Sequence, residues 1–256
     1  HQMVRGLDIF KKHFEEYSDN YIIIGGTACD LILDEAGFTA RSTKDIDIVL
    51  IVEALKPDFV KQFWLFIKNG NYELKEKVEE RNCYRFTKPT NVEYPHQIEL
   101  FSKKPDVITD DENIHLTPIP VEEGLSSLSA ILMNDEYYKF VIDSSETING
   151  IHRAKTESLI CLKAKAYLDF NERISNGSTE DKKNLTKHKG DVFRLASLLA
   201  PDQKIELPTG IKKDLAEFIK NIGGDLPGKE IFKSAGIGNL DPEKVYRQII
   251  EIFQLT

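Results

Sequence analysis

The sequence predicts an α/β (α+β) fold in which a mixed-sheet domain, residues 3–152, is followed by a helical domain, residues 153–256. Strand patterns alternate with helical patterns in the first part, beginning with the β-branched run of residues 22–24. After Ile151 the apolar residues recur at helical spacing instead. A content of 41% hydrophobic and 30% charged residues is ordinary for a globular chain with a proper core.

The spacing of apolar residues and the positions of glycines predict the first helices and strands. Leu7, Phe10 and Phe14 repeat at helical spacing, so a helix over 4–17 precedes the first strand. The strand of residues 21–24 reads as buried on both faces and ends at two glycines. The following elements are a helix that opens at Thr27, a strand over 45–50, and an amphipathic helix over 57–69 that Asn69-Gly70 stops.

The remainder of the first domain shows shorter strand patterns. We expect strands at 72–74, 83–86 and 97–101, strand-like segments at 114–121 and 137–142, and a short helix at 124–132. The helical domain follows with helices over 156–174, 184–199, 211–222 and 242–253, interrupted by a polar loop at 176–183 and a Gly/Pro-rich link at 223–228.

The charge and the cysteine content limit which classes of partner and which cellular compartment we expect. The 34 basic and 42 acidic residues give a net charge of −8, which argues against nucleic acid bound over the whole surface but allows a local basic cleft. Three widely separated cysteines, without metal-ligand spacing, indicate buried thiols in a reducing compartment. No apolar run reaches the length of a membrane span and no signal peptide is recognised, so we expect a cytoplasmic protein without a membrane partner.

The stretch from residue 21 to residue 50 contains the candidate groups for binding a phosphate and a metal ion. The turn at Gly25 and Gly26 leads into a helix, and backbone N–H groups at such a turn suit a phosphate. Asp45 and Asp47 lie two residues apart on a strand, so both carboxylates project from one face. Two acids on one face repel unless a cation lies between them, and Mg²⁺ is the usual ion with oxygen ligands.

Glu99 is the candidate third acid. It lies in an apolar strand, where burying a charge without a partner is costly. It is either a third carboxylate beside Asp45 and Asp47 or an exposed glutamate on an edge strand. In the first case the three acids hold one or two Mg²⁺ ions against a nucleoside triphosphate (NTP), with Glu99 ligating the catalytic metal or taking the acceptor proton. The backbone of Gly26 and the hydroxyl of Thr27 then hold the triphosphate.

This stretch resembles the DNA polymerase β-like nucleotidyltransferase superfamily, whose signature is an apolar strand, G-[GS], a helix, and D-x-[DE] on the next strand. More narrowly, Gly25-Gly26-Thr27-Ala28 with Arg41-x-Thr43-x-Asp45-x-Asp47 resembles the AbiEii-type nucleotidyltransferase toxins of bacterial abortive-infection and toxin–antitoxin systems. The resemblance covers the first domain and extends more loosely into the helical one. The 18 residues from Thr27 to Lys44 make the gap longer than is usual in the superfamily.

The resemblance also implies roles in the helical domain. Lys163 matches a lysine that contacts nucleotide phosphates, and Asp191, with Lys187 or Lys189, matches a motif that shapes the far wall of the cleft. Lysines on such helices also extend simply to solvent. Arg41 is either a phosphate contact or a surface partner of Asp34 or Glu35.

The basic run Lys182, Lys183, Lys187, His188 and Lys189 has two interpretations. It is a solvated face, as most charge runs are, or a patch that suits a polyanionic acceptor such as RNA.

These observations predict a Mg²⁺-dependent nucleotidyltransferase that moves a nucleoside monophosphate from an NTP to an acceptor hydroxyl. The resemblance implies a toxin, with tRNA, another RNA or a protein as acceptor and a cognate antitoxin as a partner. One alternative is a nucleotidyltransferase that modifies small molecules such as antibiotics. Another, from a different class, is a catalytically silent module that binds a nucleotide or a partner protein.

Overall fold

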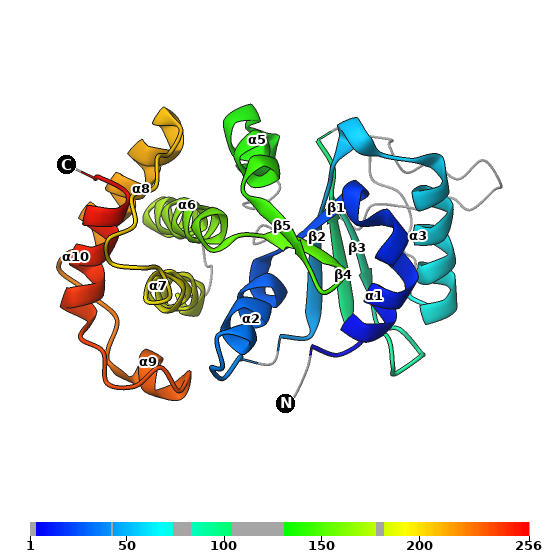
Figure 1. Cartoon of the computed structure of the whole chain (residues 1–256), viewed down its shortest axis with the longest axis horizontal. Coiled ribbons are helices and arrows are strands. Elements are labelled where there is room, and N and C mark those ends of the chain that lie inside the picture. Colours follow the sequence, from blue (N-terminus) through cyan, green and yellow to red (C-terminus); the bar gives the residue numbers. More distant parts are fainter. Residues whose placement is uncertain (1–3, 42, 74–82, 104–130, 178–181, 256) are drawn as a thin grey trace. The chain divides into compact units, whose positions relative to one another are not determined.

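The structure, a computed structural model, describes residues 4–41, 43–73, 83–103, 131–177 and 182–255. It is a mixed α/β fold, as the sequence predicts (Figure 1). Its six-stranded sheet contains parallel and antiparallel pairs. Contacts divide the chain into two compact units. Unit 1 comprises His1–Asp30, Ser42–Glu122 and Ser145–Ala154, and unit 2 comprises Leu31–Arg41, Glu123–Ser144 and Lys155–Thr256.

The sheet belongs to unit 1 and has the strand order β3-β4-β2-β1-β6-β5. Strand β1 (Tyr21–Ile24) is fully buried, as predicted for an inner strand, and pairs antiparallel with β2 (Asp45–Leu50) and parallel with β6 (Ile151–Ala154). On one side β2 pairs parallel with β4 (Gln97–Phe101), which pairs antiparallel with β3 (Cys83–Thr87). On the other side β5 (Ser145–Ile148) forms a hairpin with β6.

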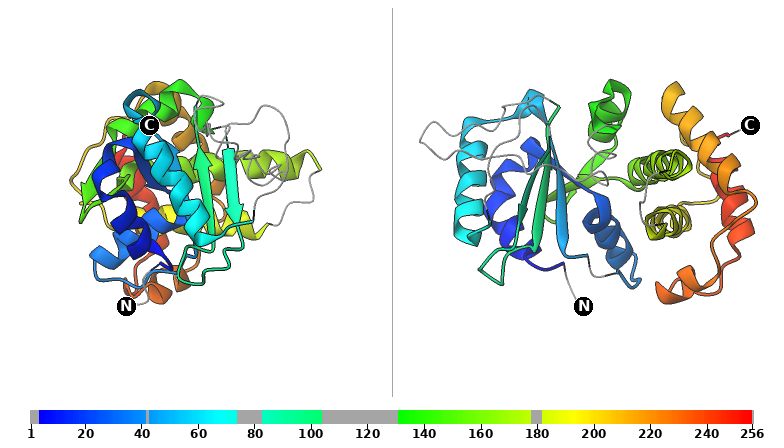
Figure 2. Two further views of the ribbon diagram at one scale, coloured as in Figure 1. Left: turned by 90° about the vertical axis from the view of Figure 1, so that its right-hand side faces the viewer. Right: turned by 180° about the vertical axis from the view of Figure 1, so that it is seen from behind.

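Helices α1 (Leu7–Phe14) and α3 (Pro57–Gly70) lie on one side of the sheet, and α2 (Gly25–Glu35) runs on the other (Figures 1 and 2). Two 3₁₀ segments, Glu15–Asn20 and Val52–Ala54, connect helices and strands. The space between α1, α3 and β1 is filled by aromatic rings, which form the core of unit 1: Phe10, Phe14, Tyr21, Phe59, Phe63 and Phe66.

Unit 2 is helical around α6 (Thr156–Ser175). This long helix packs against α7 (Lys183–Ala196) and α8 (Thr209–Ile222), and α10 (Pro242–Ile252) packs against both of these. Helix α5 (Asp135–Asp143) contacts α6 and α8, and the short α9 (Glu230–Ser234) contacts α7. No helix in the described part of the chain is long and apolar enough to cross a membrane.

Several predicted elements are corrected. The strand-like segment at 137–142 is wrong, because it lies in α5, whose first N–H groups are capped by Asn134 Oδ1. Helix α2 begins at Gly25 rather than at Thr27. The β5–β6 hairpin and α9 were not expected from the sequence. The turn of the hairpin is Asn149-Gly150 with φ angles of 52° and 77°, the Asn-Gly turn that favours two-residue hairpins.

Some predictions fall outside the described residues. These are the strand-like segment at 114–121, most of the short helix at 124–132, and the last residue of the segment at 72–74. The predicted boundary at residue 152 lies inside β6, and unit 2 also takes in two earlier segments, Leu31–Arg41 and Glu123–Ser144.

Candidate active site

The three acids lie on two adjacent parallel strands. The register pairs Asp45 with Gln97 and Asp47 with Glu99, and paired residues point to the same face of a sheet. Glu99 is only 4% exposed, and β4 is flanked by β2 and β3. The reading of Glu99 as an exposed edge-strand glutamate is therefore wrong.

The acids point away from the aromatic core. The opposite face of the sheet carries Ile98 of β4 and its register partner Phe86 of β3, and the Phe86 ring lies 5.6 Å from that of Phe63 on α3. The alternation of strand side chains thus sends the apolar residues toward α1 and α3 and the carboxylates to the other face. This is the arrangement that the residue spacing of β2 and β4 predicts.

The glycine turn lies directly against Asp47. Gly25 has φ of 69°, a left-handed conformation that favours glycine, and a Cβ built there would overlap Asp47 Oδ2. A Cβ on Gly26 would lie 3.0 Å from the side chain of Thr43. Both glycines therefore allow a close approach between the start of α2 and the acid-bearing segment.

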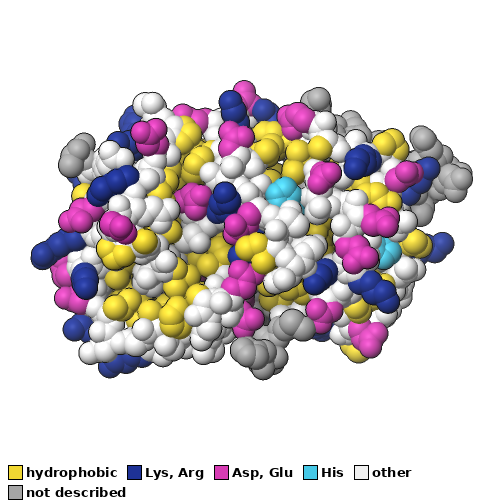
Figure 3. All heavy atoms as spheres, viewed as in Figure 1, with side chains coloured by type: hydrophobic (Ala, Val, Ile, Leu, Met, Phe, Trp, Pro, Cys, Tyr) yellow, Lys and Arg dark blue, Asp and Glu magenta, His cyan; other side chains and the backbone are white. Residues whose placement is uncertain are grey.

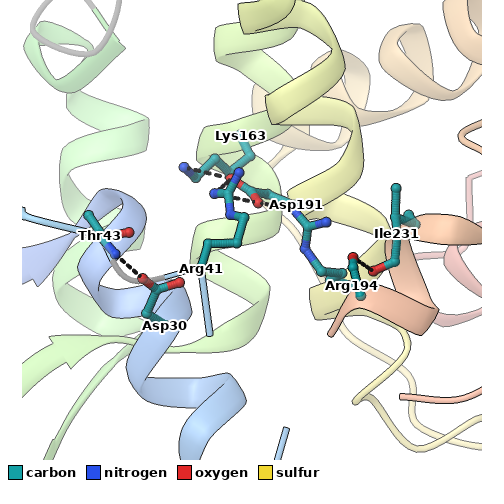
Figure 4. Close-up of polar contacts among 8 residues, drawn as sticks. Asp30, Arg41, Thr43, Lys163, Asp191, Arg194 and Ile231 are labelled. Atoms are coloured by element: carbon teal, nitrogen blue, oxygen red, sulfur yellow. Dashed lines mark hydrogen bonds and ion pairs between the residues drawn. The ribbon is translucent and has the colours of Figure 1, made fainter. Parts of the chain in front are cut away.

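Two buried side chains of α2 form hydrogen bonds with the backbone of the segment that carries Asp45 and Asp47. Thr27 Oγ1 donates a hydrogen bond of 2.5 Å to the carbonyl oxygen of Asp45, so its hydroxyl holds the protein backbone in this structure. Asp30 Oδ2 accepts the N–H of Thr43 at 2.8 Å (Figure 4). Asp30 was not predicted from the sequence. The signal for it was a carboxylate three residues after Thr27 on a helix face that is otherwise buried.

The carboxylate of Glu99 is held by two donors. Arg85 Nε lies 3.0 Å and Gln97 Nε2 lies 2.6 Å from its Oε1. Burial, together with the charges of Asp47 and Asp45, outweighs the lowering by Arg85 and raises the pKa of Glu99 to about 8. Asp45 and Asp47 are thus close enough to disfavour the ionised form of Glu99, and a bound cation would offset that repulsion.

The donor set fits a hard divalent cation by its chemistry, because three carboxylates share one sheet face and Asp47 reaches the glycine turn. Within the described ranges, no group of three or more His, Cys, Asp or Glu side chains is arranged to hold a metal ion. The two hydrogen bonds to Oε1 direct the Glu99 carboxylate toward Arg85 and Gln97. Both donors contact Oε1, so Glu99 would ligate a metal through Oε2 or would give up one of these hydrogen bonds.

A second charged cluster lies in unit 2 and centres on Asp191 (Figure 4). Its carboxylate, 2% exposed, lies 2.7 Å from Arg41 Nη2, 3.1 Å from Lys163 Nζ and 2.6 Å from Arg194 Nη2. Burial alone would raise the pKa of Asp191, but the three cations hold it well below its ordinary value. Arg194, three residues after Asp191 on α7, was not predicted from the sequence.

These contacts locate the residues predicted to bind the nucleotide. Arg41, Lys163 and Asp191 are together in unit 2, and Arg41 contacts Asp191. Lys189 lies apart from this cluster, because its Nζ contacts the carbonyl oxygen and Oδ2 of Asp225, both at 2.6 Å. The acids and the two glycines belong to unit 1.

Unit 2 also contains a cavity of about 460 Å³ between α5, α6 and α8. Its polar groups contact one another: the Tyr137 hydroxyl donates to Asp214 at 2.9 Å, and Lys165 lies 3.5 Å from both Asp214 and Asp169. The contacts from Tyr137 and Lys165 to Asp214 join α5 and α6 to α8, which is a structural role.

Neither the family models nor the curated proteins include a match to this chain.

Proposed function

We propose that this protein is a divalent-cation-dependent nucleotidyltransferase. The observation that carries the proposal is the register of β2 and β4, which puts Asp45, Asp47 and Glu99 on one face of the sheet. The glycine turn against Asp47 adds a backbone suited to a phosphate at the start of α2.

In this reaction the acceptor hydroxyl oxygen forms a bond to the α-phosphorus of the NTP, the bond from that phosphorus to the bridging oxygen breaks, and pyrophosphate leaves. The hydroxyl proton passes to a base, a role that Glu99 takes if it is not a ligand of the catalytic metal. Asp45, Asp47 and Glu99 would hold Mg²⁺, which neutralises the triphosphate and lowers the pKa of the attacking hydroxyl when it is bound. Thr27 and Asp30 act as positioning residues, because they fix the segment that carries the acids.

The assignment of Lys163 and Asp191 to the nucleotide comes from the sequence resemblance and stays a prediction. In the structure Lys163 contacts Asp191 at 3.1 Å, and Asp191 also contacts Arg41 and Arg194. The role of a bacterial toxin, with a cognate antitoxin, comes from the same resemblance. It predicts that expression of the chain in bacteria arrests growth and that the Asp47→Ala variant does not.

The test is transfer of label. The purified protein is incubated with Mg²⁺, each of the four NTPs labelled at the α-phosphate, and either tRNA, total RNA, lysate protein or an aminoglycoside. We expect label on one of the macromolecular acceptors and a loss of about 10²-fold or more in Asp47→Ala and Glu99→Gln. Asp58→Ala, which removes a carboxylate that is 76% exposed on α3, is the matched control and retains full transfer.

The other outcomes select the alternatives. Label on the aminoglycoside would identify a nucleotidyltransferase of small molecules. The hydrogen bonds from Arg85 and Gln97 to Glu99 are the observation that favours a silent module, because both occupy Oε1 of the third acid. NTP binding without transfer to any acceptor would support that module and contradict the proposed reaction.

A further inference from the structure

Arg85 is a basic residue that the fold places against Glu99. It lies on β3 directly opposite Glu99 in the β3–β4 register, with Nε 3.0 Å from Oε1. Both side chains are largely buried, with 18% of Arg85 and 6% of Glu99 exposed. A charge pair in such a place is weakly screened by solvent, so it affects the ions that bind beside it.

We infer that Arg85 is a counter-ion of the three-acid site, and that its charge weakens the binding of a divalent cation there. The inference rests on the proposed function, because it takes Asp45, Asp47 and Glu99 as the ligands. Three carboxylates on one face repel one another, and the guanidinium offsets part of that repulsion. A cation that binds the same Glu99 carboxylate is repelled by the positive charge of Arg85.

Gln97 allows the orientation of the Glu99 carboxylate to be distinguished from the repulsion of a cation. It also donates to Glu99 Oε1, at 2.6 Å, but it carries no charge. Gln97 therefore orients the carboxylate without repelling a cation. Only the removal of the Arg85 charge is expected to tighten cation binding.

The experiment measures Mn²⁺ binding without nucleotide, from the electron paramagnetic resonance signal of free Mn²⁺, so that turnover plays no part. We expect Arg85→Gln to bind Mn²⁺ about tenfold more tightly than the natural chain. Lys88→Gln is the matched control, since Lys88 follows the same strand, is 66% exposed and pairs with Glu73, so its affinity stays unchanged. Gln97→Ala is expected to bind no more tightly than the natural chain.

The outcomes distinguish this inference from the proposed function. If the natural chain binds Mn²⁺ in a way that Glu99→Gln weakens, but Arg85→Gln binds no more tightly, the counter-ion role is wrong and the metal site stands. If neither chain binds Mn²⁺, both fail. Circular dichroism confirms folding, and Arg85→Met, which keeps the apolar stem, replaces Arg85→Gln if that variant does not fold. In a Glu99→Gln background, loss of Arg85 gives a smaller gain, because its partner is already absent.

Discussion

Gly25 joins β1 to α2 with φ of 69°, and any Cβ at this position would overlap Asp47 Oδ2. We expect Gly25→Ala to lower the free energy of unfolding by about 3 kcal/mol, since it combines backbone strain with displacement of a carboxylate. Transfer activity falls with it, because Asp47 moves. Gly37→Ala is the control. Gly37 has φ of 80° with nothing within 4 Å of a built Cβ, so only about 1 kcal/mol is lost. Equal losses in urea unfolding would show that the Asp47 contact has no effect.

Asp191 is the buried anion that three cations share, and its removal leaves these cations without their common partner. We expect Asp191→Asn to lower the free energy of unfolding at pH 7 by about 3–5 kcal/mol. The folded pKa of Asp191 is below its ordinary value of 3.8, so its contribution is present above that pH and is lost as the pH falls below it. The difference between the two proteins in urea unfolding should therefore shrink from pH 5 to pH 3.

The control for that comparison is Asp58→Asn, which removes a carboxylate that is 76% exposed and pairs only along α3 with Lys61. Its effect is expected to be within about 0.5 kcal/mol at either pH. A loss at pH 7 that is equally small in Asp191→Asn would contradict the stabilising role of the cluster.

The individual acids could be predicted because strand side chains alternate. Asp45 and Asp47 share a face on any strand, and Glu99 shares it once β4 pairs with β2 in the observed register. Arg85 could not be predicted, since its place opposite Glu99 depends on the pairing of β3 with β4 across a connection whose length does not fix the register. The pairing of Arg41 with Asp191 joins residues 150 positions apart, which no local pattern reveals.

Helix α3 stabilises unit 1 through one face. Phe66 is fully buried, with its ring 4.8 Å from Tyr94 and 5.3 Å from Phe14, whereas its neighbour Leu65 is 44% exposed. We expect Phe66→Ala to lower the free energy of unfolding by about 3–5 kcal/mol, because it leaves a cavity in the aromatic core. Leu65→Ala changes it by about 0.5 kcal/mol or less. Similar losses in urea unfolding would contradict the orientation of α3.

At the scale of elements, long periodic segments were predictable and short ones were not. Helices α3, α8 and α10 follow the predicted ranges closely, because each has a clear apolar face and a Pro, Gly or Asn near an end. Helix α5 reads as a strand in isolation, since Tyr137, Tyr138, Phe140 and Val141 have β propensity, and burial against other helices overrides that preference. The β5–β6 hairpin has an Asn-Gly signal, but its strands are only four residues long.

At the scale of the whole chain, each compact unit is built from three separate segments of the sequence. A composition change predicts a single boundary, whereas the contacts assign Leu31–Arg41 and Glu123–Ser144 to the helical unit before the sheet is completed by β5 and β6. Such a division depends on contacts between distant segments, such as the hydrogen bond from the Thr39 N–H to the Ala235 carbonyl. Periodicity carries no information on these contacts, so the fold class was predictable and the division was not.

The charge of the whole molecule bears on the acceptor. Acidic and basic side chains are interspersed on the face shown in Figure 3, in keeping with a net charge of −8. The basic run on and before α7 is the candidate RNA contact, but Lys189 is 7% exposed and bonded to Asp225, so it does not belong to that surface. Lys182, Lys183 and Lys187 are exposed and remain as the surface that the RNA hypothesis requires.

If RNA is the acceptor, reversing these three lysines to glutamate should weaken RNA binding and reduce its dependence on salt, by about 0.7 in the logarithmic slope for each lost phosphate contact. The matched control reverses the exposed Lys220, Lys233 and Lys244. Each set changes the charge by six, from −8 to −14, so any effect of net charge is common to both. Filter binding from 50 to 200 mM salt is the measurement. Equal slopes for the two variants would leave only a general charge effect and would direct the search for the acceptor to proteins and small molecules.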